Sequence, residues 1–162
     1  MKILLLIDRL DIGGAETHVA SLARALAARG NRVTVASSGG VLEQGLTSDG
    51  VQTAHLDDRF VRSFAANVAR LLHLVRKEQP DVIHAHTRRT ALLLRAVKAL
   101  ISLAPSRFLE KPTDLWEGYR HRSLWRVAAP ACIVTAHARF RPRYRHLSYW
   151  GDATVAVSDD LA

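Results

Sequence analysis

The chain has 162 residues, enough for one domain with a hydrophobic core of its own. Its 48% hydrophobic and 23% charged residues exclude an intrinsically disordered protein, and no stretch approaches the roughly 20 apolar residues of a membrane-spanning helix. The formal net charge of +8 favours anionic partners, namely nucleotide phosphates, lipid headgroups or nucleic acid, unless the excess belongs to a solvated basic face. The single cysteine, Cys132, excludes an internal disulfide, and we expect a structural thiol in a cytoplasmic protein.

Six apolar, strand-like runs follow one another along the chain, and each ends in a polar or glycine-rich cluster. They are Lys2–Asp8, Arg32–Ser37, Val51–His55, Asp81–His86, Ala131–Thr135 and Ala153–Val157. Amphipathic helical patterns lie between them, at Ala15–Arg29, Leu42–Asp49, Val61–Gln79 and Ala91–Ala104. Short apolar strands that alternate with helices are typical of a parallel sheet covered on both faces. The sequence therefore predicts an α/β fold, a Rossmann-like doubly wound parallel sheet of about six strands with helices on both faces.

In such a sheet, ligands bind outside the carboxyl ends of the strands. The first strand is followed by Gly13 and Gly14 and then by a helix. Without side chains, these residues let a ligand approach the backbone, and the free N–H groups of the helix start attract phosphate or sugar oxygens. The alternative is a simple tight turn. Neither a Gly-x-Gly-x-x-Gly loop nor a Gly-Lys-Ser/Thr loop is present at this turn, which argues against a dinucleotide oxidoreductase and a P-loop ATPase.

Histidines and arginines close the fourth strand. His84 and His86 are two residues apart, so their side chains share one face of the strand. No further ligand has a recognisable spacing from this pair, and we expect no metal. We expect His84 to be buried and hydrogen-bonded. His86 and Arg88 should reach the crevice, where Arg88 or Arg89 is placed to bind a phosphate or a carboxylate.

The second half of the chain adds aromatic and basic residues. The segment 105–130 interrupts the alternation of strands and helices, and its tryptophans and arginines suit a lipid interface, a stacked ligand or packing onto the sheet. His137 follows the fifth strand, where a histidine can hydrogen-bond a sugar hydroxyl or move a proton, and the alternative is a bystander histidine. Four arginines at alternate positions from 139 to 145 suit nucleic acid, but the usual motif signatures are missing. A helix cap at Ser158 stands close to the last residue, so we expect the chain to be half of a larger protein.

Four segments occur in an order and spacing that resemble the N-terminal domain of family 4 glycosyltransferases with the two-domain GT-B fold. These segments are 11–16 (DIGGAE), 30–35 (GNRVTV), 80–86 (PDVIHAH) and 155–158 (VAVS). The resemblance covers nearly the whole chain, and segment 105–130 is least like the family. It implies that residues 1–162 are the acceptor-side domain of an enzyme that moves a sugar, with retention, from a nucleotide-sugar donor to a carbohydrate or lipid-linked acceptor. It also implies cell-surface polysaccharide or glycolipid synthesis, without a metal or other cofactor.

The resemblance assigns roles to individual residues. Gly13 and Gly14 would face the phosphate and sugar of the donor. His137 would be the catalytic histidine that contacts the donor sugar, and His86, Thr87 and Arg88 would line the acceptor side. The family's donor-binding pair of glutamates, with seven residues between them, has no counterpart among the five glutamates of this chain. We therefore expect the C-terminal donor-binding domain to lie elsewhere, in a missing segment or a partner chain, and this chain to be inactive alone.

Three further expectations concern partners and alternatives. A lipid-linked acceptor, together with the basic and tryptophan-bearing segment 105–130, implies peripheral contact with an anionic membrane on its inner face. A non-catalytic Rossmann-like module that binds nucleic acid or a protein is one alternative, with nucleic acid the less expected partner. A two-domain enzyme of similar architecture, such as a sugar-nucleotide epimerase, is another.

Overall fold

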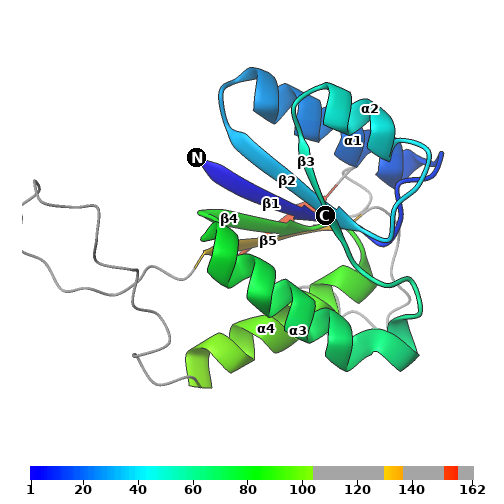
Figure 1. The fold of residues 1–162 in the computed structure, drawn as a ribbon. Coiled ribbons are helices and arrows are strands. Elements are labelled where there is room, and N and C mark those ends of the chain that lie inside the picture. Colours follow the sequence, from blue (N-terminus) through cyan, green and yellow to red (C-terminus); the bar gives the residue numbers. More distant parts are fainter. Residues whose placement is uncertain (104–129, 137–151, 157–162) are drawn as a thin grey trace, which may run out of the picture.

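The computed structural model describes residues 1–103, 130–136 and 152–156, in which strands and helices alternate (Figure 1). The strands are β1 Lys2–Leu6, β2 Arg32–Ser37, β3 Gln52–His55, β4 Val82–Ala85, β5 Ala131–Ala136 and β6 Ala153–Ala156. The helices are α1 Gly14–Ala28, α2 Glu43–Ser48, α3 Phe60–Glu78 and α4 Arg88–Leu103. Every strand and helix that the sequence predicts is therefore present. The largest shift is at the start of α4, which begins three residues before the predicted Ala91.

The described strands form one parallel sheet in the order β3-β2-β1-β4-β5-β6. β1 lies between β2 and β4, with Lys2 opposite Arg32 and Ile3 opposite Val82. The chain proceeds outward from β1 through β2 to β3, and then returns past β1 to build the other half from β4. The order of strands therefore reverses between β1 and β4, which is the point where open α/β sheets form a crevice at their carboxyl edge. The Rossmann-like, doubly wound fold is confirmed.

Helices cover both faces of this sheet. α1 and α2 lie on one face, and α3 and α4 lie on the other (Figure 1). The side chains of β1 alternate between the two layers: Ile3 and Leu5 pack with α1 and α2, whereas Leu4 and Leu6 pack with α3 and α4. Each fully buried leucine of this kind stabilises the fold by roughly 1.5–3 kcal/mol. Because both faces are buried, β1 has no polar position between Ile3 and Ile7.

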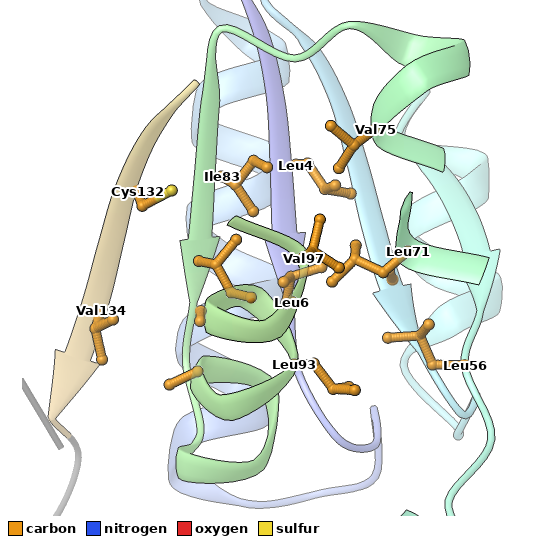
Figure 2. Close-up of a cluster of buried hydrophobic side chains, with 14 residues drawn as sticks. Leu4, Leu6, Leu56, Leu71, Val75, Ile83, Leu93, Val97, Cys132 and Val134 are labelled. Carbon is orange, nitrogen blue, oxygen red and sulfur yellow. The ribbon is translucent and has the colours of Figure 1, made fainter. Parts of the chain in front are cut away.

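The larger of the two cores joins the sheet to α3 and α4, and Figure 2 shows how its side chains meet. Leu71 and Val75 come from α3, and Leu93 and Val97 come from α4. They pack on a set of strand residues that includes Leu4, Leu6, Ile83, Cys132 and Val134. This core fixes α4 against β4 and β5, and it thereby fixes the N-terminal end of α4 at the carboxyl edge of the sheet.

Asp152 ties the outermost strand to its neighbours. Its carboxylate accepts hydrogen bonds from the Cys132 backbone N–H (2.8 Å) and from the Lys98 ammonium of α4 (2.6 Å). The Lys98 hydrogen bond and then the Cys132 N–H lower the pKa of Asp152. Burial raises the pKa of the Cys132 thiol, so this cysteine is a buried structural group rather than an activated nucleophile.

Candidate functional site

The loops that leave β1 and β2 are bonded to each other at the carboxyl edge of the sheet. The Leu10 N–H donates to the Gly39 carbonyl (2.8 Å), and the Leu42 N–H donates to the Leu10 carbonyl (2.9 Å). Gly40 adopts a φ of +146° between these two bonds, and a Cβ at this position would lie 2.3 Å from the carbonyl carbon of Leu10. The two loops therefore form one rigid platform from which α1 and α2 begin.

Gly13 and Gly14 stand on this platform at the start of α1. Gly13 is the N-cap residue, and Gly14 is exposed with nothing near the position of a Cβ. The space beside Gly13 is occupied, unlike that beside Gly14, because a Cβ at Gly13 would lie 2.3 Å from a carboxylate oxygen of Glu16. A carboxylate in the first turn is favoured by the helix dipole. The Glu16 carboxylate therefore lies beside Gly13, where its negative charge opposes the approach of an anion.

The start of α4 is capped by two threonines. The Thr90 N–H donates to the Thr87 hydroxyl oxygen (3.2 Å), and the Thr87 N–H donates to the Thr90 hydroxyl oxygen (3.1 Å). This reciprocal pair has the form of a capping box with threonine in place of the usual Glu or Gln. The Thr87 hydroxyl also donates to a carboxylate oxygen of Asp8 (3.1 Å). The loop after β1 and the start of α4 are thus joined across the point where the strand order reverses.

Asp8 is the half-buried carboxyl group at this junction. Burial raises the pKa of Asp8 above its usual value, and the hydrogen bond from Thr87 and the positive charge of Arg89 offset this only in part. The nearby carboxylate of Glu16 raises the pKa further. The surroundings of Asp8 therefore disfavour its charged form, which is common for groups that serve a binding or catalytic site.

We expect the substitution Asp8→Asn to raise the free energy of unfolding at pH 7. Because the pKa is higher in the folded chain than in the unfolded one, the stabilising contribution of this group is present below the unfolded pKa and is lost as the pH rises through the folded pKa. An asparagine stays neutral and retains an oxygen that accepts from Thr87. Urea unfolding at pH 7 and pH 3 tests this prediction: the variant should gain on the wild type at pH 7 and show little difference at pH 3. A loss of stability at pH 7 would contradict it.

His84 of β4 and His86, which follows the strand directly, lie on one face as predicted, but His86 is more deeply buried than expected. His84 is half-buried and hydrogen-bonded to the Thr135 hydroxyl of β5. His86, which was expected to reach the crevice, is only 2% exposed. Its ring centroid lies 4.0 Å from that of His84 and 5.9 Å from that of His18 on α1. The His86 ring is therefore buried rather than exposed to the crevice, and its backbone N–H donates to the Leu6 carbonyl of β1 (2.9 Å); its role on the acceptor side stays a prediction.

A hollow of about 60 Å³ opens at the same edge, between the ends of β1 and β3 and the helices α3 and α4. We refer to it as the β1–β3 hollow. Leu56 and Leu93 give it an apolar floor, and Asp8, Asp57, Asp58 and Arg89 are among its polar lining. The sequence-based prediction missed Asp57 and Asp58. They are the polar cluster that follows the third strand. The rule that ligands bind outside the carboxyl ends of parallel strands, which singled out Gly13 and His86, therefore applies to them as well.

The loop that carries Asp57 and Asp58 is held by Asn67, a polar residue of α3 that is only 1% exposed. The Asn67 side chain accepts from the Asp57 N–H (2.9 Å) and donates to the Asp57 carbonyl (2.8 Å). The Asp57 carboxylate in turn accepts from the Arg59 N–H and the Ser63 hydroxyl, and these two hydrogen bonds lower the pKa of Asp57. The wall of the hollow is therefore held by a buried side-chain amide that bonds both the backbone N–H and the carbonyl of Asp57.

The structure brings some of the predicted site residues together and separates others. Thr87 is bonded to Asp8 at the carboxyl edge, and Arg88 is exposed as the first residue of α4, whereas Arg89 lines the hollow. The predicted catalytic His137 lies outside the described residues, as do residues 105–129, the arginines at 139–145 and the cap at 158–160. Within residues 1–103, 130–136 and 152–156, no three His, Cys, Asp or Glu side chains are grouped as metal ligands. None of the helices in that part of the chain is long and apolar enough to cross a membrane.

Comparison with known proteins relates the chain to a protein family and to solved structures. The model of a protein family described as Glycosyltransferase Family 4 matches residues 12–127, which include most of the segment set apart in the sequence. The crystal structure of a glycosyltransferase from Rickettsia africae ESF-5 is similar in fold, with a TM-score of 0.65 at 17% sequence identity. That similarity covers 97% of this chain and 36% of the Rickettsia chain, so the present chain spans about a third of that protein. No curated protein sequence matches the chain.

Proposed function

Because the chain belongs to glycosyltransferase family 4, we propose that it is the acceptor-binding half of a retaining glycosyltransferase. The enzyme would move a sugar from a nucleotide-sugar donor to a carbohydrate or lipid-linked acceptor. The observation that carries the proposal is the junction of Asp8, Thr87 and Arg89 at the carboxyl edge, where the strand order reverses within a fold of this family. Ligands of open α/β sheets bind at this edge.

The donor would approach the start of α1. Gly14 leaves the helix N-terminus open, and backbone N–H groups there favour phosphate oxygens. In the transfer, the bond between the donor sugar and its phosphate breaks, and a new bond forms between that sugar carbon and an acceptor hydroxyl. The hydroxyl proton passes to the departing phosphate. We propose that His137 contacts the donor sugar and that the helix N-terminus and arginines balance the charge without a metal ion.

The acceptor would lie on the side of α4, against Thr87 and Arg88. His86 is buried, so it would support the end of β4, next to Thr87 and Arg88, rather than contact the acceptor. The donor nucleotide would need a second domain, in a further segment or a partner chain. We propose that the assembled enzyme works in the cytoplasm, against the inner face of an anionic membrane, in cell-surface polysaccharide or glycolipid synthesis.

The test begins with the DNA that follows the codon for Ala162. If it encodes a second α/β domain with two glutamates that have seven residues between them, the joined protein should release a nucleoside diphosphate from one of a panel of nucleotide sugars when a lipid or carbohydrate acceptor is added. The 162-residue chain alone should release none. A joined protein that is folded but inactive with the whole panel would contradict the proposal. Salt-sensitive binding to nucleic acid that survives substitution of Gly14 would favour the binding-module alternative.

A further inference from the structure

We propose that the β1–β3 hollow is a subsite for an uncharged, hydroxyl-bearing edge of a sugar, and that it rejects an acidic sugar at this position. The proposal rests on the acceptor-side function given above and adds the chemical class of the acceptor. It concerns a group of residues that the sequence motifs do not mark, at the ends of β1 and β3.

The lining of the hollow pairs hydrogen-bond acceptors with hydrogen-bond donors. Asp8, Asp57 and Asp58 bring three carboxylates, and Arg9 and Arg89 bring two guanidinium groups. An ionised carboxylate only accepts hydrogen bonds and a guanidinium only donates them, whereas a sugar hydroxyl does both. Neighbouring hydroxyls of one sugar can therefore bind a carboxylate and an arginine at the same time.

The charges of the lining disfavour an anion. Three carboxylates and two guanidinium groups leave a formal charge of −1, in a chain whose net charge is +8. Arg9 already contacts Asp11 (2.7 Å) and lies 3.7 Å from Asp58, while Arg89 acts on the carboxylate of Asp8. A bound carboxylate or phosphate would compete with these acids for the same arginines and would be repelled by them. The positive charge of the whole chain therefore does not extend to this hollow.

The size and floor of the hollow limit the ligand further. At about 60 Å³, with Leu56 and Leu93 buried beneath it, it has room for one edge of a sugar ring and its substituents. The apolar floor suits the C–H groups of a sugar, and the polar rim suits its hydroxyls.

The test is a pair of titrations of the ¹⁵N-labelled chain, with methyl glucoside and with methyl glucuronide, followed by NMR. These sugars have the same ring, and they differ by one carboxylate. We expect the glucoside to shift the amides of Asp57, Asp58 and Thr90, and to bind about tenfold more tightly than the glucuronide. Asp58→Asn should narrow this difference by strengthening glucuronide binding. Asp49→Asn is the matched control, because Asp49 pairs with Arg24 at similar exposure (47%, against 52% for Asp58) before the start of β3.

Three results would overturn the proposal: glucuronide binding as tight as glucoside binding, glucoside shifts confined to other parts of the chain, or no shift with either sugar up to the limit of solubility. These outcomes are separable from the fate of the proposed function. Sugar binding in the hollow without any transfer by the joined enzyme would retain the subsite and reject the transferase. Transfer by the joined enzyme at a rate that depends neither on the charge of the acceptor nor on Asp58→Asn would retain the transferase and reject the subsite.

Discussion

Replacing Gly40 with alanine is expected to lower the free energy of unfolding by about 3 kcal/mol. The new methyl group would lie 2.3 Å from the carbonyl carbon and 2.5 Å from the carbonyl oxygen of Leu10, and these are backbone atoms that cannot rotate away. The φ of +146° adds strain for any residue with a side chain. Relief would require the two bonded loops to separate, so we also expect the shape of the site to change. Urea unfolding followed by circular dichroism measures the loss.

Gly14→Ala is the matched control for this experiment. Gly14 has nothing within 4 Å of the added methyl group and lies in the first turn of α1, where alanine is the better helix former. Its stability should equal or slightly exceed that of the wild type. The prediction fails if Gly40→Ala loses less than about 1 kcal/mol, because that would mean that the loops yield at little cost.

The second large effect is expected at Asn67. Replacing it with leucine keeps the branched shape of the side chain, at a somewhat larger volume, and leaves both the N–H and the carbonyl of Asp57 without their buried partner. Each buried polar group left unbonded costs about 1–3 kcal/mol, so we expect a loss of about 2–4 kcal/mol in the free energy of unfolding. Asn31→Ala is the control, because Asn31 also donates to a backbone carbonyl, that of Leu26 (2.9 Å), from a less buried position. Its loss should be about 1 kcal/mol or less.

Asn67→Asp separates the hydrogen bonds from the packing. An ionised aspartate would still accept from the Asp57 N–H, but its second oxygen would face the Asp57 carbonyl, which the amide of Asn67 now contacts at 2.8 Å. Burial and this repulsion would raise the pKa of the new carboxyl, against the opposing effect of the Arg70 guanidinium, which donates to the Asn67 side-chain oxygen (3.2 Å), and a protonated carboxyl donates where the amide does. The free energy of unfolding of the variant should therefore be lower than that of the wild type at pH 7, and the difference between the two should be smaller at pH 4. Equal losses at both pH values would show that the donated bond does not matter.

The fold could be predicted from local patterns because both kinds of element carry clear signals. The run Ile3–Ile7 is apolar at every position, which is what burial on both faces of the sheet requires. The start of α4 was placed three residues late because its cap is a threonine pair, Thr87 and Thr90, rather than the usual capping box with Glu or Gln.

The candidate site was less predictable, because burial depth and contacts between distant segments are not local properties. The period of β4 places His84 and His86 on one face, but it does not tell which ring α1 covers. The β1–β3 hollow depends on Asp8, Asp57 and Arg89, which come from three elements and meet only after the sheet forms. Asn67 has no sequence signal of its own, since a single asparagine on a helix is usually exposed.

The carboxylate of Glu16 beside Gly13 has a consequence for how the chain would respond to salt. When an anion takes the place of that carboxylate, one negative group leaves the helix start as another arrives, so the local charge changes little. Fewer ions are then exchanged with the solvent than the net charge of +8 suggests. Binding at Gly13 would accordingly weaken only slightly with ionic strength. Attraction of anions to the exposed arginines of the rest of the surface would fall steeply under the same conditions.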